Sequence, residues 1–384
     1  MIPYGHQDIS DEDVAAVTEV LRSEWLTQGP AIERFEAAVA ERCEVPHAVA
    51  LSNGTAALHL ACIALGLGPG GLLWTSPVTF VASANCARYC GADVDFVDID
   101  PRTYCMSADV LAAKLEAAER AGRLPDIVVP VHMAGQPCDM PAIAELARRY
   151  GFAVIEDASH AIGAEYDGVP VGSCRHSDAA TFSFHPVKIV TTGEGGMVVS
   201  RRAEVCERAA LLRTHGITRD EALMDCESEG GWYYQQIALG YNYRMTDIQA
   251  ALGTSQMKRL DAFLARRREL AARYDAALAE LPVTLPWQRP GTASAWHLYV
   301  IRVREDAGRT RREVYDSLRS AGIGVNVHYI PVHLQPYYRT LGFEPGDFPE
   351  SERYYDEAIS LPMFAALTDG QQDEVVTALK GALR

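Results

Sequence analysis

The stretch Thr181–Gly196, TFSFHPVKIVTTGEGG, contains the residue best placed for covalent chemistry, Lys188. Its first half alternates apolar and small residues as a buried strand does, and Pro186 cannot continue a central ladder. Lys188 is therefore expected just past a strand end, before the turn-rich TTGEGG run and a second strand in Gly195–Ser200. A lysine in such a loop can form a Schiff base with an aldehyde cofactor, although a solvated lysine on a hairpin fits the same pattern.

Two further sets of polar groups also follow apolar strands. Gly54 and Thr55 come after the strand expected at His47–Leu51 and begin a helix, so their backbone N–H groups are free to hold a phosphate. Asp157 follows the apolar run AVIE at another strand end. A buried carboxylate needs a cationic partner, which a protonated pyridine nitrogen would supply, whereas an exposed Asp157 would only cap the next turn.

An aromatic residue and a hydroxyl complete this set. Phe80 could form a platform for a planar ring or simply pack in the core. Ser183 lies two residues after Thr181 on the strand before the lysine, where its hydroxyl could also hold a phosphate. A lysine for an aldehyde, an aspartate for a pyridinium, an aromatic platform and a phosphate cradle together describe a site for pyridoxal 5′-phosphate (PLP).

The elements that must position these residues alternate along the first part of the chain. Strands are expected at residues 47–51, 72–77, 93–100, 127–135 and 153–161, and helices at residues 10–23, 32–43, 56–68, 79–91, 108–121 and 142–150. Such alternation predicts an α/β fold with a large, mainly parallel sheet covered on both faces. Ligands of such sheets bind at the carboxyl ends of the strands, where Gly54, Asp157 and Lys188 are expected.

The rest of the chain predicts a smaller unit. Residues 245–274 have the pattern of one long helix, and strands at 292–303 and 324–333 alternate with helices at 309–321 and 368–383. We therefore expect two domains. Residues 1–250 would form the large PLP-binding domain with an N-terminal segment, and residues 251–384 the linking helix and a small α+β C-terminal domain.

Composition excludes several classes of function. The 384 residues include 35 basic and 51 acidic side chains, and the net charge of −16 argues against a nucleic-acid partner. No apolar window is long enough to span a membrane, and the N-terminus lacks the regions of a signal peptide, so a cytoplasmic location is expected. The nine cysteines are scattered without a CxxC pair, which favours reduced thiols and no metal site.

Five blocks of the sequence carry a wider resemblance. They read SNGTAAL, TSPVTFVASAN, IEDASHAIG, FSFHPVKIVTTGEGGM and GYNYRMTDIQAALG. In order, and from about Tyr4 to Leu383, the chain resembles the DegT/DnrJ/EryC1/StrS sugar-nucleotide aminotransferases. The resemblance implies a PLP-dependent transferase of fold type I, related to aspartate aminotransferase. It also implies L-glutamate as amino donor, 2-oxoglutarate as its product, and an obligate homodimer with active sites at the subunit interface.

The same resemblance implies a role for each candidate residue. Lys188 would form the Schiff base and later move the proton, and Asp157 would pair with the pyridine nitrogen. The side chains and amides that flank the ring or hold the phosphate would be Phe80, His160, Gly54, Thr55 and Ser183. Asn242 would reach the phosphate bound by the neighbouring subunit. Apart from the family, His160 could equally be a core histidine.

Within the family, the nearest likeness is to the aminotransferases of pseudaminic acid biosynthesis. It rests on the blocks LRSEWLTQGP, THGITRD and GVNVHYIPVHLQPYY. The implied substrate is a UDP-linked 4-keto-6-deoxy-L-HexNAc, whose 4-amino sugar would be the product. Candidates for holding it are Tyr4, Gln28, Arg244 and Tyr329. Each could instead be structural, because tyrosines pack in cores and Arg244 could pair with an acidic residue of its own helix.

Three alternatives stay open beside this interpretation. The same chemistry could act on another nucleotide sugar, such as UDP-4-keto-arabinose or a dTDP-4-keto-6-deoxyhexose. Relatives that dehydrate a sugar use a histidine in place of the Schiff-base lysine, and the presence of Lys188 argues against that reaction. A non-catalytic regulatory relative would have lost part of the cofactor set, which is complete here.

Overall fold

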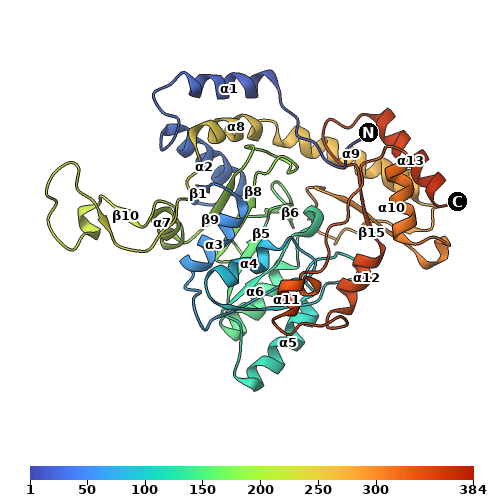
Figure 1. Cartoon of the computed structure of the whole chain (residues 1–384), viewed down its shortest axis with the longest axis horizontal. Coiled ribbons are helices and arrows are strands. Elements are labelled where there is room, and N and C mark those ends of the chain that lie inside the picture. The colour runs from blue at the N-terminus through green and yellow to red at the C-terminus, as the bar shows by residue number, and fades with distance from the viewer.

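The computed structural model describes residues 1–384, and a seven-stranded sheet lies at its centre (Figure 1). The strands stand in the order β1-β9-β8-β5-β4-β2-β3. Neighbours are parallel from β8 to β3, whereas β9 is antiparallel to both β1 and β8, so β9 alone runs against the rest. The bounds are β1 (His47–Leu51), β2 (Leu72–Thr75), β3 (Asp93–Phe96), β4 (Ile127–Val129), β5 (Ala153–Asp157), β8 (Ala179–Ser183) and β9 (Gly196–Ser200). The predicted α/β class is confirmed.

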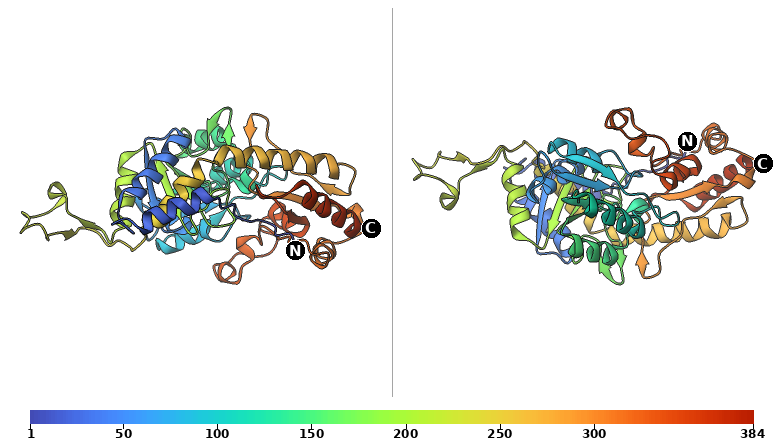
Figure 2. Two further views of the ribbon diagram at one scale, coloured as in Figure 1. Left: turned by 90° about the horizontal axis from the view of Figure 1, so that it is seen from above. Right: turned by 90° about the horizontal axis from the view of Figure 1, so that it is seen from below.

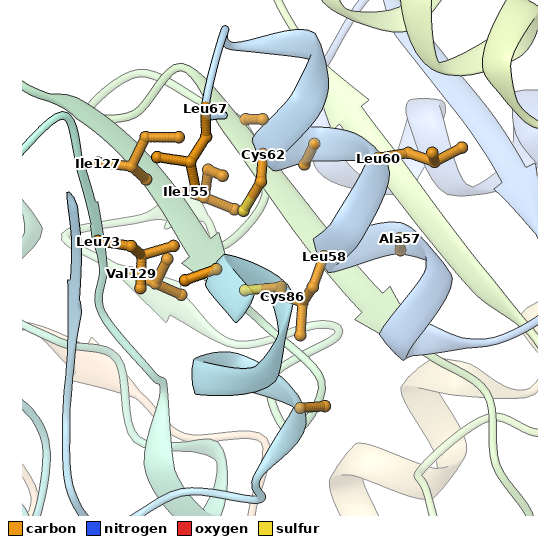
Figure 3. Close-up of a cluster of buried hydrophobic side chains, with 14 of the residues drawn as sticks. Ala57, Leu58, Leu60, Cys62, Leu67, Leu73, Cys86, Ile127, Val129 and Ile155 are labelled. Carbon is orange, nitrogen blue, oxygen red and sulfur yellow. The ribbon is translucent and has the colours of Figure 1, made fainter. Parts of the chain in front are cut away.

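Helices cover both faces of this sheet, because its short apolar strands bury side chains on either side. Along β4, Ile127 and Val129 join the core on one face and Val128 joins the core on the other. Figure 3 shows the first core, where Leu58 and Cys62 of a covering helix meet side chains of the sheet. The helices on this face are α3 (Gly54–Ala64), α4 (Ala82–Tyr89) and α7 (Ala203–Leu212). Those on the opposite face are α2 (Pro30–Cys43), α5 (Ala108–Ala121) and α6 (Met140–Tyr150).

The C-terminal part builds a second, smaller sheet. Its three strands are antiparallel in the order β12-β14-β15, with bounds β12 (Val283–Thr284), β14 (Tyr299–Val303) and β15 (Ala358–Leu361). The helices that share its core are α9 (Leu260–Leu278), α10 (Arg311–Ser320) and α13 (Asp369–Ala382), and α12 (Pro349–Glu357) also contacts β14. These elements form a core of their own, and the division into residues 1–250 and 251–384 stays a prediction.

The predicted single helix over residues 245–274 is wrong. The structure has two helices, α8 (Asp247–Met257) and α9, and the chain leaves helical geometry at Arg259 between them. Arg259 forms ion pairs with Asp8 and Asp13 of the N-terminal segment, and Gln256 also donates to Asp13. Asp13 lies in α1 (Asp11–Leu21) and Asp8 in the segment before it, so both are far from Arg259 in the sequence. The local apolar pattern could not indicate them.

Two predicted strands of the C-terminal part are also wrong. Residues 292–303 divide into β13 (Thr292–Ala293) and β14, because Trp296 between them has φ +49° and turns the chain. β13 pairs with β6 (Glu165–Tyr166), which in turn pairs with β7 (Val169–Pro170). Residues 324–333 form no strand, only one bridge between Asn326 and Ser360.

The first residues of the chain belong to the C-terminal core. The Ile2 N–H donates to the carbonyl of Gly322 at 2.9 Å, and the Ile2 carbonyl accepts from Gly324 at 2.6 Å. Two residues later, the carbonyl of Tyr4 accepts from the N–H of Met363 at 3.0 Å. The N-terminal segment is therefore tied to the far end of the sequence before α1 begins.

A long excursion, residues 217–239, projects from the body beyond α7 and is the most extended feature in Figures 1 and 2. We call it the arm. Its only strands are the short pair β10 (Ile217–Thr218) and β11 (Gln235–Gln236), too small to be stable alone. Its exposed large apolar side chains are Leu223, Trp232, Tyr234, Ile237 and Leu239.

No helix of the chain combines the length and the apolar character needed to cross a bilayer.

The glycine in the middle of α8 has a packing role that can be tested. Alanine is better than glycine in a helix by about 1 kcal/mol, but a Cβ on Gly253 would lie 2.6 Å from the Phe35 ring and 2.7 Å from Thr192 Cγ2. We expect Gly253→Ala to lower the melting temperature, because overpacking costs about 1–3 kcal/mol. Gly381→Ala in α13 is the control, since its Cβ would meet no atom within 4 Å. Thermal denaturation that found Gly253→Ala more stable than the parent would contradict this packing argument.

Candidate active site

A cavity of about 700 Å³ opens at the carboxyl ends of β5 and β8, where loops from the C-terminal part cover the sheet. It brings together most of the residues that the sequence singled out. Those lining it are Tyr4, Gly54, Thr55, Phe80, Asp157, His160, Ser183, Lys188 and Tyr329. The convergence follows from the sheet, because parallel strands end at one edge.

Lys188 lies in the turn after β8, where its backbone N–H donates to the carbonyl of His185 at 2.8 Å. Its side chain is half-buried in the cavity wall. Burial lowers the pKa of Lys188 to about 8, although the carboxylate of Asp157 acts in the opposite direction. The neutral, nucleophilic fraction of this amine near neutral pH is therefore larger than that of an ordinary lysine.

Asp157 is the last residue of β5 and is 5% exposed. Its Oδ2 accepts a hydrogen bond from Ser83 Oγ at 2.6 Å, and its Oδ1 accepts one from the Ser159 N–H at 3.1 Å. The Ser83 hydroxyl also lies 2.7 Å from Thr79 Oγ1. These contacts fix the orientation of the carboxylate and leave lone pairs for a donor in the cavity.

Sequence reasoning missed Ser83. It sits on α4, and only the packing of α4 against the end of β5 brings its hydroxyl to Asp157. A weak signal was present in the sequence, since Thr79 and Ser83 are four residues apart and so share a helical face.

The first turn of α3 forms a cradle next to Lys188. Asn53 caps the helix by accepting from the Ala56 N–H at 2.8 Å, which leaves the amides of Gly54 and Thr55 without a helical partner. Ser183 stands opposite, and a Cβ on Gly54 would lie 2.9 Å from the Ser183 Cβ. Glycine is therefore required for this close approach. Free amides at a helix start, with a hydroxyl beside them, suit a phosphate.

Three imidazoles form the wall across from the sheet. The rings of His160 and His297 lie 4.3 Å apart, and His160 Nε2 lies 3.2 Å from the Tyr329 hydroxyl. Burial lowers the pKa of His160 and His297, and the charge of Lys188 lowers both further. For His328 burial lowers the pKa to about 3. All three are therefore neutral, and Lys188 is the only lysine or arginine that lines the cavity.

The same wall holds unused hydrogen-bonding capacity. Nδ1 of His160 and Nδ1 of His297 are buried without a partner. His297, His328 and Asn326 line the cavity but were not predicted. They come from loops of the C-terminal part, and their own sequence carries no signal for this site.

Aromatic side chains flank the entrance. Phe80 is 58% exposed, and its ring centre lies 6.2 Å from that of Tyr329. Tyr4 lies 5.3 Å from the His328 ring, and burial raises the pKa of both Tyr4 and Tyr329. These phenols therefore stay protonated and can donate hydrogen bonds.

Three predicted site residues do not line the cavity of the single chain: Gln28, Asn242 and Arg244. Gln28 and Asn242 are exposed, the first in the turn before α2 and the second bridged to Thr214. Arg244 is half-buried. The structure brings none of them to Lys188.

Comparison with known proteins identifies the class. Residues 7–380 match the model of the DegT/DnrJ/EryC1/StrS aminotransferase family, and the chain belongs to this family. It is therefore a sugar aminotransferase that uses PLP.

Relatives match over the whole length. Spore coat polysaccharide biosynthesis protein SpsC of Bacillus subtilis is 40% identical over 387 residues, which cover 100% of this chain and 97% of SpsC. Helicobacter pylori PseC, an aminotransferase involved in pseudaminic acid biosynthesis, is 29% identical with a TM-score of 0.90, covering 100% and 99% of the two chains. Spr1654 of Streptococcus pneumoniae, solved in PMP and PLP forms, is also 29% identical in the PMP form, with a TM-score of 0.90 and the same coverage.

The cavity fits PLP on its own chemistry. When bound, PLP supplies an aldehyde that reacts with an amine and a protonated ring that acts as an electron sink. Lys188 could hold its aldehyde, the oriented carboxylate of Asp157 could hold its ring nitrogen, and the cradle at Gly54 could hold its phosphate. The orphan imidazole nitrogens could accept or donate to its remaining polar atoms.

The lowered pKa of Lys188 predicts how the apoenzyme captures PLP. Only the neutral amine attacks an aldehyde, and with a pKa of about 8 its neutral fraction is about one-tenth at pH 7 and one-half at pH 8. We expect the capture rate to rise about tenfold from pH 6 to pH 7 and to level off above about pH 9. Stopped-flow absorbance measures the capture rate, and the control is Lys188→Arg, which should not capture PLP. A capture rate that still rises about tenfold above pH 9 would show that the pKa of Lys188 is that of an ordinary lysine.

The close approach at Gly54 predicts a second effect. Gly54→Ala should weaken PLP binding by about tenfold or more, because the added methyl fills the space between the helix start and Ser183. Equilibrium dialysis of the apoenzyme against PLP measures the dissociation constant. Gly68→Ala, whose Cβ would meet no atom within 4 Å, is the matched control. Unchanged affinity for Gly54→Ala would place the phosphate elsewhere.

Proposed function

We propose that this enzyme transfers the amino group of L-glutamate to the C4 keto carbon of a UDP-linked 4-keto-6-deoxy-L-HexNAc, as in pseudaminic acid biosynthesis. The observation that carries the proposal is the likeness to Helicobacter pylori PseC over the whole chain, at a TM-score of 0.90. The neutral, aromatic wall of the cavity supports an uncharged sugar ring next to Lys188.

Two side chains perform the proton chemistry in this proposal. Lys188 Nζ, as a free amine, removes the proton from the α-carbon of the donor and delivers it to C4′ of the cofactor, and a positioned base of this kind contributes about 10²–10⁴-fold. Asp157 holds a proton on the ring nitrogen, and Ser83 and Ser159 keep the carboxylate in place. The keto acid leaves before the keto sugar enters, so ping-pong kinetics are expected.

Binding roles follow from the position of the lining residues. Gly54, Thr55 and Ser183 would hold the phosphate, while Phe80 and His160 would lie against the cofactor ring. Tyr4 and Tyr329 are candidates for the sugar, because their protonated hydroxyls line the cavity. Gln28 and Arg244 remain candidates for the nucleotide end of the substrate.

We propose that the enzyme works as a homodimer with its sites at the subunit interface. Asn242, exposed in one chain, would contact the phosphate of its neighbour. The apolar side chains of the arm support such an interface, since Trp232 is 72% and Leu239 82% exposed.

A second nucleotide sugar is the alternative substrate. SpsC of Bacillus subtilis, a spore coat polysaccharide biosynthesis protein, is 40% identical, against 29% for PseC. The same chemistry on UDP-4-keto-arabinose or a dTDP-4-keto-6-deoxyhexose would use the same Lys188 and Asp157.

Absorbance spectroscopy separates these substrates. L-glutamate should convert the PLP band of the purified holoenzyme to the PMP band, and a keto sugar that accepts the amino group should restore it. Recovery with the UDP-linked 4-keto-6-deoxy-L-HexNAc alone supports the proposal. Recovery only with a dTDP sugar or the keto-arabinose would move the enzyme to another pathway, and no conversion by glutamate would exclude this donor.

Substitution of Asp157 tests its role separately. Asp157→Asn should fold and retain PLP, but the single-turnover rate with L-glutamate should fall by at least about 10²-fold, because the ring nitrogen loses its proton. Lys188→Ala should lose nearly all turnover while it still binds PLP. A rate for Asp157→Asn equal to that of the parent would remove Asp157 from the chemistry.

A further inference from the structure

A buried arginine lies behind the cavity wall without an acidic partner. Arg267 of α9 is 2% exposed, and its side chain forms no ion pair with any carboxylate of the chain. Burial lowers the pKa of Arg267 to about 10, so the guanidinium is still charged near neutral pH. A buried charge is costly unless hydrogen bonds offset the loss of water. The groups that Arg267 contacts therefore show what this charge does.

One nitrogen of Arg267 holds three backbone carbonyls. Nη1 donates to the carbonyls of Trp296 at 3.0 Å, His297 at 3.2 Å and Met363 at 3.0 Å. No backbone N–H and no other side chain donates to these three oxygens. Without Arg267, the carbonyls of His297 and Met363 would be buried without a donor, and such groups are rare in folded proteins.

The two segments that Arg267 holds are each tied to a residue of the cavity wall. The ring of His297 lines the cavity and lies 4.3 Å from the ring of His160. The N–H of Met363 donates to the carbonyl of Tyr4 at 3.0 Å, and Tyr4 also lines the cavity. Arg267 itself does not line it. Arg267 can therefore act on the site only through these neighbours.

The loop of His297 also packs closely against the turn after β4. The N–H of Ala295 donates to the carbonyl of Gly135 at 3.1 Å, and the N–H of Leu298 donates to that of Ala134 at 3.2 Å. A Cβ on Gly135 would lie 3.0 Å from the backbone nitrogen of His297, so the two backbones are in close contact. The guanidinium and this turn together restrict where the imidazole can lie.

We propose that Arg267 is a positioning residue of the active site. It fixes the His297 imidazole and the Tyr4 side chain on the cavity wall by holding the carbonyl of His297 and that of Met363, whose N–H binds Tyr4. Loss of the guanidinium lets both segments shift, and a shift of about 1 Å can cost about 10²-fold in rate. The kinetic consequence rests on the proposed function, with L-glutamate as donor, whereas the placement of the two segments does not.

Hydrogen–deuterium exchange of the holoenzyme tests the placement. In Arg267→Met, peptides that contain the amides of Ala295, Leu298 and Met363 should exchange at least about tenfold faster than in the parent, because these amides lie next to carbonyls that have lost their donor. Peptides of β5 and β8 should keep the rate of the parent. Equal exchange in parent and variant would overturn the proposal. A rise that spreads equally to β5 and β8 would also overturn it, because it would show a general loss of stability.

Two more variants complete this test. Arg266→Met is the matched control, because Arg266 on the same helix donates to the carbonyl of Leu367 at 2.8 Å and pairs with Asp369 at 2.7 Å, away from the cavity. A rise as large in Arg266→Met as in Arg267→Met would contradict a specific role. Arg267→Lys keeps the charge and three donors on a shorter side chain, so it should give a smaller rise than Arg267→Met. It also provides the measurement if Arg267→Met does not fold.

Single-turnover kinetics tests the consequence for catalysis. At saturating L-glutamate, conversion of the PLP band to the PMP band should be about tenfold or more slower in Arg267→Met. The dissociation constant of PLP should change by less than about threefold, because the cradle at Gly54 belongs to the large sheet. In a His297→Ala background the same substitution should cost much less, since the group that it positions is gone.

Two outcomes of the kinetics are decisive. An equal cost of Arg267→Met in both backgrounds would overturn the proposal, because independent effects add. If L-glutamate fails to convert the parent enzyme, the proposed donor is wrong, and the exchange measurements still decide the role of Arg267.

Discussion

The site depends on holding one buried carboxylate in a fixed orientation inside the protein. Asp157 is almost fully buried, and an unpaired charge there would cost several kcal/mol. Hydrogen bonds from Ser83 and Ser159 and the nearby amine of Lys188 offset that cost. Each of these partners comes from a different part of the fold, so β5, β8 and α4 must all be in place before the carboxylate is stable.

The two parts of the chain contribute different chemistry. The large sheet supplies the charged groups and the free amides at the start of α3, because its parallel strands end at one edge. The C-terminal part supplies neutral groups, the imidazoles of His297 and His328 and the phenol of Tyr329. Lys188 is the only lysine or arginine that lines the cavity, and the carboxylates of Asp157 and Glu194 line it too.

The sequence was most informative where the signal is local. A short apolar run, a glycine turn and a polar residue placed Gly54, Asp157 and Lys188 correctly at the strand ends. The site residues Ser83, His297 and His328 were not predicted, because only tertiary packing brings them to the cavity. The break between α8 and α9 was not predicted for the same reason, because Arg259 forms ion pairs with Asp8 and Asp13, which are distant in the sequence. Asn242 is exposed and is bridged to Thr214, so its contact with a neighbouring subunit stays a prediction.

The attachment of the first residues to the C-terminal core has a consequence for biosynthesis. Ile2 and Tyr4 leave the ribosome long before their partners Gly322, Gly324 and Met363. The sheet and the cradle can fold while translation continues, whereas the wall that contains Tyr4 can close only after Met363 has emerged. A nascent chain therefore holds an open, unfinished pocket, and a ribosome that stalls before the last strand releases a protein that cannot enclose its substrate.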